Sequence, residues 1–574
     1  MKYIYAIICA VLSALGLYAC QPVQDDGQVE YKLVQDLLEF EKDGGVQYIN
    51  IQTVSEVKAS SPDSWCTVSD NQSQSAKMVK LAVTVSANEG VEARSTSVNL
   101  TIGGKVNEKV EVIQKGNPLY VEKTEVVLDA SAQEFSVKVS ASDTYDVEIE
   151  GSWVKKISLD ASEAKFSAAK NNLASSRNAV ITFKTSKASH VLTVTQEGYT
   201  GPAPDPDKTG MESDAITLMK KMTLGINLGN TLEAIGGETA WGAPRTTEDI
   251  IKYFKELGFN AVRVPCSWDQ NLEEGEGYVV KSSWMDRVKE VIDYIVGNDM
   301  YAILNIHWDG GWLENDIPNG YSEEVDAQQK AIWTQIATTF RDYDEHLLFA
   351  GTNEPNVNDA DDMATLLRYE QTFIDAVRAT GGRNAYRVLV FQGPNTDVDR
   401  TVQLMNTLPT DSVEGRLAAE VHYYTPWQFC GMAQDESWGK MAFFWGDEME
   451  SYATGSYAGR WVRGNNEEYL AGQMAKMKKK FWDNGIPVII GEFGADSWRQ
   501  CNLGTAEENA KAKEGYAKSL ALFNACMVRE AKANGCVPFY WHCEDDMIDR
   551  SALTVVDQAK LDAMVEAGRT QYPD

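Results

Sequence analysis

Two glutamates follow or interrupt apolar segments, and their setting is the first indication of chemistry in the chain. Glu354 lies in "LFAGTNEPN" (348–356), and Glu492 lies in "VIIGEFGA" (488–495). Pro355 restricts the residue before it to extended backbone, so we expect Glu354 at the mouth of a strand. A single glutamate at a strand end is more often a solvated cap, so the interpretation depends on whether the two meet.

A pair of facing carboxyl groups suits the hydrolysis of a glycosidic bond. One carboxylic acid protonates the leaving oxygen, and the other carboxylate attacks the anomeric carbon or activates water. The transition state is positively charged, so a nearby carboxylate also stabilises it. Glu354 and Glu492 are far apart in the sequence, and the fold must bring them together.

Residues 211–574 contain elements that can do this. Short apolar runs alternate with amphipathic stretches, which predicts helices between the strands of a parallel sheet. Eight runs favour an α/β (β/α)8 TIM barrel. An open doubly wound sheet is the alternative, but no Gly-rich dinucleotide turn follows the first run. The runs are LGINLG (224–229), FNAVRVP (259–265), YAILNIHW (301–308), LLFAGTNEP (347–355), RVLVFQG (387–393), LAAEVHYY (417–424), IPVIIGEFG (486–494) and CVPFYWHCE (536–544).

The active site of such a barrel lies at the carboxyl ends of its strands. Three of the five histidines in the chain fall at predicted strand ends. Arg263 is suited to keep Glu492 ionised by charge and hydrogen bonding. Tyr424 can donate to the same carboxylate, and Asn353 can bind a sugar hydroxyl. The strand ends carry Asn227, Asn230, Arg263, His307, Trp308, Asn353, Glu354, His422, Tyr424, Glu492, Trp541 and His542.

The motifs FNAVRVP, NIHW, TNEP, HYY, GEFG and FYW together resemble those of glycoside hydrolase family 5, the retaining cellulase family, over the whole of 211–574. LGINLGNTLEA and GGETAWGAPRTTEDII further resemble its branch of endo-β-1,4-glucanases, which includes members active on xyloglucan and mixed-linkage glucan. The resemblance implies that Glu354 is the general acid/base and Glu492 the nucleophile. It implies a supporting catalytic set of Arg263, His307, Asn353, His422 and Tyr424.

The same resemblance implies that Trp541 is a stacking platform beside the bond that is cleaved. Many relatives carry a second histidine after His307, where this chain has Trp308, so the contact of those relatives does not transfer to this position. Thirteen of the 15 Trp lie in 211–574, many in predicted loops, and sugars stack on aromatic rings. This favours a cleft for a polymer. The predicted substrate-binding residues are Trp541, Asn227, Trp308, Trp312 and Trp427.

We therefore expect a retaining endo-hydrolase of β-1,4-glucosidic bonds in cellulose, mixed-linkage β-glucan or xyloglucan, acting without a cofactor. An endo-β-mannanase or dedicated xyloglucanase on the same scaffold is the alternative, because the rim loops decide the substrate. A non-catalytic surface glycan-binding lipoprotein should have lost one glutamate, and both are present. A metal pair of His307 and His422 lacks a third ligand at suitable spacing. Rival carboxylates near the rim, Asp309, Asp545 and Asp546, lie outside the two glutamate motifs.

The N-terminal part contains an internal repeat, residues 32–116 and 117–198. Both halves alternate apolar with polar residues, the period of half-buried strands. They resemble BACON domains, which implies two all-β sandwiches that bind glycan or act as spacers; we favour spacers, because neither shows an exposed aromatic cluster. A Pro-rich linker (199–210) follows. The matching pairs are SWCTV (64–68) with SWVKK (152–156), Arg94 with Arg177, and VEVIQKG (110–116) with LTVTQEG (192–198).

The first residues, "MKYIYAIICAVLSALGLYAC", predict a signal peptide (1–19). Its end resembles a bacterial lipoprotein box, which implies lipidation of Cys20 at the start of an acidic tether (20–31). Plain cleavage after Ala19 is the alternative. We expect an exported lipoprotein at the outer membrane or cell surface of a Gram-negative-type bacterium, anchored to the membrane by its lipid and monomeric. The net charge of −31 argues against a nucleic acid partner.

Overall fold

A computed structural model describes residues 29–69, 73–75, 77–275, 277–495, 497, 499–543 and 546–574. The predicted signal peptide, Cys20 and most of the tether lie outside the described residues, and so does Asp545. In the described part of the chain, no helix is long and apolar enough to cross a membrane.

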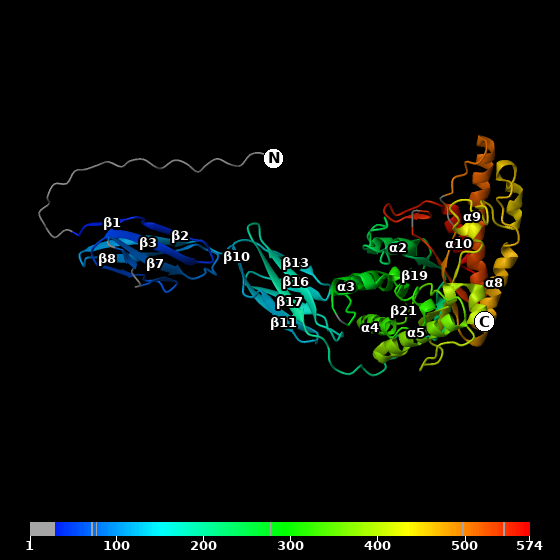
Figure 1. The fold of residues 1–574 in the computed structure, drawn as a ribbon, viewed down its shortest axis with the longest axis horizontal. Coiled ribbons are helices and arrows are strands. Elements are labelled where there is room, and N and C mark those ends of the chain that lie inside the picture. Colours follow the sequence, from blue (N-terminus) through cyan, green and yellow to red (C-terminus); the bar gives the residue numbers. More distant parts are fainter. Residues whose placement is uncertain are drawn as a thin grey trace.

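The N-terminal part forms two β-sandwiches, which confirms the predicted fold class (Figure 1). In the first, the sheet β1-β3-β7-β5 faces the sheet β2-β9-β8-β4, and β6 pairs with β7. In the second, β10-β12-β15-β14 faces β11-β17-β16-β13. The strands are β1 (Tyr31–Leu33), β2 (Leu37–Phe40), β3 (Gly45–Thr53), β4 (Val57–Ser60), β5 (Cys66–Val68), β6 (Ser73–Ser75), β7 (Met78–Val85), β8 (Arg94–Ile102), β9 (Val106–Gln114), β10 (Leu119–Val121), β11 (Glu125–Leu128), β12 (Gln133–Ala141), β13 (Asp146–Glu150), β14 (Val154–Leu159), β15 (Glu163–Ala168), β16 (Arg177–Lys184) and β17 (Ser189–Gln196).

The residues that mark the repeat form the same cluster in each sandwich. The guanidinium of Arg94 lies 4.4 Å from the centre of the Trp65 ring, and its Nε donates to Oε1 of Gln114 at 2.8 Å. Gln114 is fully buried and in turn donates to three backbone carbonyls. The repeated residues therefore hold each sandwich together by a cation–π contact and hydrogen bonds. The second cluster consists of Arg177, Trp153 and Gln196.

Eight parallel strands of the described chain, β18 to β25, close into a barrel in chain order, and β18 pairs with β25. Each predicted apolar run contains one of them, which confirms the predicted TIM barrel. Nearly every strand residue is buried, as expected for parallel strands covered on both faces. The strands are β18 (Gly225–Asn227), β19 (Ala261–Val264), β20 (Tyr301–Asn305), β21 (Leu347–Ala350), β22 (Leu389–Gln392), β23 (Leu417–Tyr423), β24 (Val488–Phe493) and β25 (Cys536–Tyr540), and a small hairpin β26 (Ile548–Asp549) and β27 (Thr554–Val555) follows.

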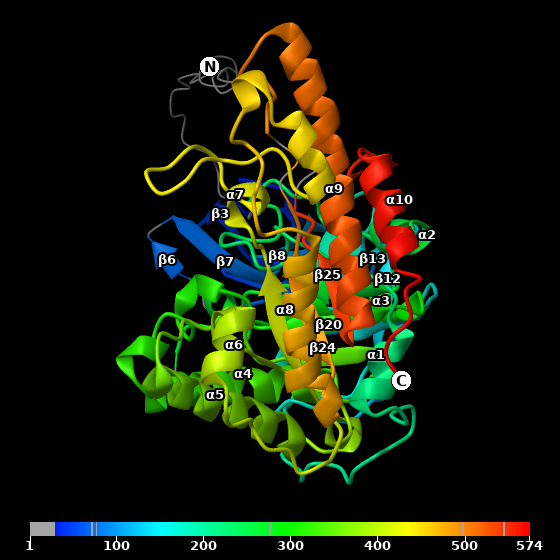
Figure 2. The ribbon, with the colours of Figure 1, turned by 90° about the vertical axis from the view of Figure 1, so that its right-hand side faces the viewer.

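Helices cover the outside of the barrel, and α8 and α9 pack side by side on one flank (Figure 2). Most begin at a residue whose side chain accepts a backbone N–H, such as Thr505 before α9. The helices are α1 (Ala215–Lys221), α2 (Glu248–Glu256), α3 (Ser282–Gly297), α4 (Glu323–Thr339), α5 (Ala360–Ala379), α6 (Val398–Leu404), α7 (Trp427–Cys430), α8 (Glu467–Lys480), α9 (Ala506–Ala533) and α10 (Gln558–Ala567).

The barrel interior changes from apolar to polar along the strands. At the amino end, Ile303 and Val390 belong to a core cluster that α1 closes from below. Strand side chains alternate between faces with a period of two. Two residues further on, the interior side chains are therefore polar, and they build the floor of the carboxyl end. Such pairs are Ala261 with Arg263, Ile303 with Asn305, Val390 with Gln392, and Ala418 with Glu420.

Candidate active site

Arg263, from β19, lies fully buried at the centre of the carboxyl end. Its Nη1 donates to Oε1 of Glu492 (2.9 Å) and Oδ1 of Asn227 (3.0 Å). Its Nη2 donates to Oδ1 of Asn353 at 2.8 Å, and its Nε lies 2.9 Å from Oε1 of Glu420. A buried charge is tolerated only when it is paired and hydrogen-bonded. These four partners come from β18, β23, β24 and the loop after β21, so Arg263, on β19, links five of the eight strands at that end of the barrel.

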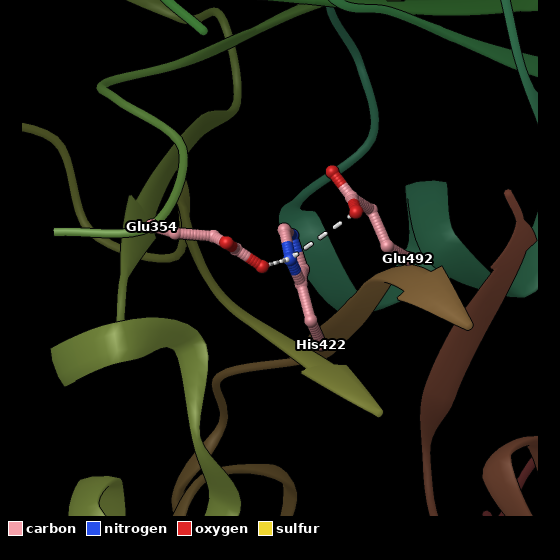
Figure 3. A group of neighbouring side chains, drawn as sticks. All are labelled: Glu354, His422 and Glu492. Carbon is pink, nitrogen blue, oxygen red and sulfur yellow. Dashed lines mark hydrogen bonds and ion pairs between the residues drawn. The ribbon is translucent and has the colours of Figure 1, made fainter. Parts of the chain in front are cut away.

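The two predicted catalytic carboxylates meet on either side of His422, which projects from β23 (Figure 3). Nδ1 of His422 lies 2.7 Å from Oε1 of Glu354 and 3.7 Å from Oε2 of Glu492. One oxygen of each carboxylate and this nitrogen all lie within 4.8 Å of one another. A pair this close fits the roughly 5 Å of retaining glycosidases, whereas inverting enzymes hold their carboxyl groups about 6.5–9.5 Å apart.

His422 carries a positive charge in this setting. Burial alone would lower its pKa, but the carboxylates of Glu492, Glu354 and Glu420 raise the pKa of His422 to about 10. Burial alone would raise the pKa of Glu354, but the hydrogen bond from His422 lowers the pKa of that carboxyl below its ordinary value. In the free protein, the proton between these two side chains therefore belongs to the histidine.

Glu492 lies deeper, on β24, and is almost fully buried. Burial raises the pKa of its carboxyl above the ordinary value, and the charges of His422 and Arg263 oppose that rise. The hydroxyl of Tyr424 donates to Oε2 of Glu492 at 3.0 Å and also favours the ionised form. Three cationic or hydroxyl donors thus surround a carboxylate that must stay ionised in order to act as a nucleophile.

The carboxylates line a cleft of about 350 Å³. Trp308 is 43% exposed beside it. The ring of His307 lies nearly parallel to that of Trp541, with ring centres 5.9 Å apart. Burial and the charges of Arg263 and His422 lower the pKa of His307 well below its ordinary value, so it is neutral. The cleft is lined by His307, Trp308, Glu314, Asn315, Asn353, Glu354, Asn356, Asn395 and Glu492.

The structure places some predicted site residues differently from our expectation. Asn227 is fully buried and does not line the cleft; its amide nitrogen donates to the carbonyl of Gly491 at 2.8 Å while its oxygen holds Arg263. Asn227 is therefore a support of Arg263 and not a substrate contact. Trp427, at the start of α7, is 51% exposed but is absent from the described lining of the cleft.

The rival carboxylates have structural partners. Asp309 is buried and accepts hydrogen bonds from the backbone of Trp268 and Asp269, and from Nε1 of Trp312 at 2.9 Å. It therefore fixes the loops that carry these residues, and it orients Trp312, which is half-buried. Asp546 forms an ion pair with the buried Lys560 at 2.8 Å.

Glu420 and Glu314 are parts of the site that the sequence interpretation missed. Glu420 is fully buried and lies 2.9 Å from Arg263 and 3.3 Å from Nε2 of His422. The sequence does indicate Glu420, because a glutamate two residues before His422 in an apolar strand points to the same face as the histidine. Glu314 lies in a loop, and no periodicity marks its position.

The side chains present do not fit a metal site built on His307 and His422. The described residues with metal-binding side chains that converge are Glu354, His422 and Glu492. A histidine held in its protonated form has no lone pair to give to a metal ion. His307, the other half of the proposed metal pair, is not in this group.

The chain is similar to known carbohydrate-active proteins. A family model described as "Cellulase (glycosyl hydrolase family 5)" matches residues 227–546, and the BACON model, described as "Putative binding domain, N-terminal", matches residues 55–115 and 127–197. The xyloglucan-specific endo-β-1,4-glucanase BoGH5A of Bacteroides ovatus is 32% identical over 79% of this chain and 92% of its own length. Endoglucanase B of Clostridium cellulovorans is 32% identical over 62% of this chain and 74% of its own length.

A solved structure is similar as well. XEG5B, a xyloglucan-specific β-1,4-glucanase from a ruminal metagenomic library in complex with XXLG, is 35% identical, with a TM-score of 0.56. The match covers 63% of this chain and 98% of that protein.

Replacement of Tyr424 by Phe tests the electrostatics of Glu492. Loss of the hydroxyl removes a hydrogen bond that lowers the pKa of Glu492, so that pKa should rise. Because Glu492 must be ionised, the acidic limb of the kcat/KM profile should move to higher pH. We expect kcat/KM at the optimum to fall about 10- to 100-fold, as for a lost hydrogen bond to a charged group. Tyr423→Phe, in the adjacent core, is the control. An unmoved acidic limb would contradict this assignment.

Proposed function

The chain belongs to glycoside hydrolase family 5, as its motifs predicted, and we propose that it is a retaining endo-β-1,4-glucanase that cleaves β-glucan chains by double displacement. One observation carries the mechanism. Glu354 and Glu492 approach within 4.8 Å at the carboxyl end of the barrel, on either side of a protonated His422. That separation leaves room for a sugar carbon between them but not for a water molecule as well.

In the first step, a sugar chain covers Glu354, whose side chain is 46% exposed in the free protein. Loss of water disfavours the charged carboxylate, so the proton of His422 passes along the 2.7 Å hydrogen bond to Glu354. Glu492 then attacks the anomeric carbon, and the bond to the leaving oxygen breaks as Glu354 gives that oxygen its proton. The product is a glycosyl ester of Glu492.

In the second step, the ester has removed the negative charge of Glu492. Loss of this neighbouring charge lowers the pKa of Glu354, which favours its ionised form. Glu354 then takes a proton from water, and the resulting hydroxide attacks the anomeric carbon and releases Glu492. Two inversions give net retention. Arg263 and Tyr424 hold Glu492 in the position where it serves as nucleophile and then as leaving group.

The cleft supports a polymeric substrate. Trp308 lines the cleft, and the ring of Trp541 lies nearly parallel to that of His307, which also lines it. Sugar C–H faces pack on such rings. Asn315, Asn356 and Asn395 add amides that can bind sugar hydroxyls. Xyloglucan is a specific candidate substrate, because two of the similar proteins are described as xyloglucan-specific. Xyloglucan and unbranched β-1,4-glucan share the same backbone, and the loops around the cleft decide which of the two the enzyme prefers.

A panel of polysaccharides tests the function. The purified enzyme should release oligosaccharides from carboxymethylcellulose, mixed-linkage β-glucan or xyloglucan, and viscosity should fall before reducing ends accumulate, as for an endo-acting enzyme. Glucomannan and mannan are included to test the mannanase alternative. Glu354→Gln serves as the inactive control of the same size. Hydrolysis of mannan alone, or of none of these polymers, would overturn the proposal.

We further propose that the enzyme is an exported lipoprotein anchored through Cys20, with the sandwiches as spacers between membrane and barrel. The spacer role is supported by the Trp65 and Trp153 rings, because an arginine side chain already covers each of them. Such rings cannot stack on a sugar on that face.

Lipidation can be tested by metabolic labelling with palmitate. Wild-type protein expressed in a Gram-negative host should incorporate the label and partition into detergent, whereas Cys20→Ser should do neither. Cys9→Ser, within the predicted apolar signal segment, should behave like the wild type. Wild-type protein that carries no lipid and is released after cleavage at Ala19 would contradict the proposal.

A further inference from the structure

Glu314 is a buried carboxylate that the double displacement does not use. Only 4% of its surface is exposed, and it lies between η2 (Asp309–Gly311) and η3 (Ile317–Asn319), in the loop after β20. It lines the cleft together with Glu354. Among the described residues, the partners of its carboxylate are neutral hydrogen-bond donors and not cationic side chains.

All these donors come from the segment that carries Glu354. Oε1 of Glu314 accepts the hydroxyl of Thr352 at 2.9 Å. The same oxygen accepts the backbone N–H groups of Asn353 (2.8 Å) and Glu354 (2.6 Å). The backbone carbonyl of Glu314 accepts the N–H of Asn356 at 3.3 Å. Pro355 has no N–H, so one residue binds every backbone N–H group from 353 to 356.

The backbone of residues 352–356 is not held by the hydrogen bonds of regular secondary structure. The segment lies between the end of β21 at Ala350 and the start of α5 at Ala360, so the N–H groups of residues 352–356 take no part in the backbone hydrogen bonds of a strand or helix. Buried backbone N–H groups need other partners in that case. Oε1 of Gln392 accepts the N–H of Thr352 at 2.8 Å, and the N–H of Asn395 donates to the carbonyl of Pro355 at 2.8 Å. The hydrogen bonds to Glu314 fix the part between these two anchors.

We infer that Glu314 is a positioning residue that fixes the backbone of residues 352–356 and thereby aims the carboxyl group of Glu354 at the glycosidic oxygen. The inference rests on the proposed function, in which Glu354 is the acid. Asn353 gives the segment a second constraint, because its side chain is held by Arg263. Arg263 thus fixes the segment from the nucleophile side, and Glu314 fixes it from the opposite loop.

A positioning role and a merely structural role differ in their dependence on the leaving group. A poor leaving group, such as the sugar hydroxyl of a glucan, needs protonation by Glu354. The dinitrophenolate of 2,4-dinitrophenyl β-cellobioside leaves without an acid. Because kcat/KM reports the steps up to the first bond cleavage, a misplaced Glu354 lowers kcat/KM for the glucan and spares it for the aryl cellobioside.

The test compares Glu314→Ala with the wild type on both substrates, with circular dichroism to check folding. We expect kcat/KM for mixed-linkage glucan to fall about 100-fold, the lower range of general acid catalysis, and kcat/KM for the aryl cellobioside to stay within about threefold. Glu314→Gln keeps an acceptor oxygen and should recover most of the glucan activity. Should Glu314→Ala fail to fold, Glu314→Asp withdraws the oxygen by one methylene and should show the same discrimination to a smaller degree.

Glu238→Ala is the matched control. Glu238 is also buried and also accepts a backbone N–H, from Thr246 at 2.8 Å, and it pairs with Arg287 at 2.7 Å. None of these residues lines the described cleft. Loss of the Glu238 side chain should lower the stability of the protein and change kcat/KM for both substrates by the same factor.

If Glu314→Ala lowers kcat/KM equally for both substrates, or lowers it for neither, the inference is wrong. Failure of the wild type on both substrates would instead refute the proposed function, so the two outcomes are distinguishable.

Discussion

The site depends on one buried cation. Arg263 has no contact with solvent, so its charge must be balanced inside the barrel, and Glu420 and Glu492 lie 2.9 Å from it on two sides. Truncation of one partner of such a group leaves an uncompensated buried charge, which typically costs 3–5 kcal/mol. The nucleophile is therefore also a structural counter-ion, and its position is set by the same contacts that stabilise the barrel end.

The second constraint is the number of carboxylates around His422. Glu354, Glu420 and Glu492 all approach its ring, and together they keep it protonated. Because Nδ1 of His422 lies 2.7 Å from Oε1 of Glu354, the free enzyme can store the proton on the histidine and deliver it to the acid when substrate excludes water. Arg263 thus keeps the nucleophile Glu492 ionised, and His422 supplies the proton that Glu354 gives to the leaving group.

The strands and the main site residues could be predicted because each step follows from a repeating rule. Apolar runs mark buried parallel strands, and a closed barrel brings every strand end to one rim, so Glu354 and Glu492 had to meet. These rules did not predict the placement of side chains whose partners do not follow from the strand period. Asn227 occupies a strand end but points inward to Arg263, and Trp268 and Trp445, which lie near strand ends or in loops, are buried in the core. Glu314 is set by loop conformation, which the sequence pattern does not encode.

The central claim is that Glu492 forms the covalent intermediate, and trapping that intermediate tests it most directly. A 2-deoxy-2-fluoro β-cellobioside with a dinitrophenolate leaving group should inactivate the enzyme and add one fluorinated cellobiosyl group per chain. Peptide mapping by mass spectrometry should place this group on the peptide that contains Glu492. A label on Glu354, or no label together with a product of inverted configuration, would contradict the account.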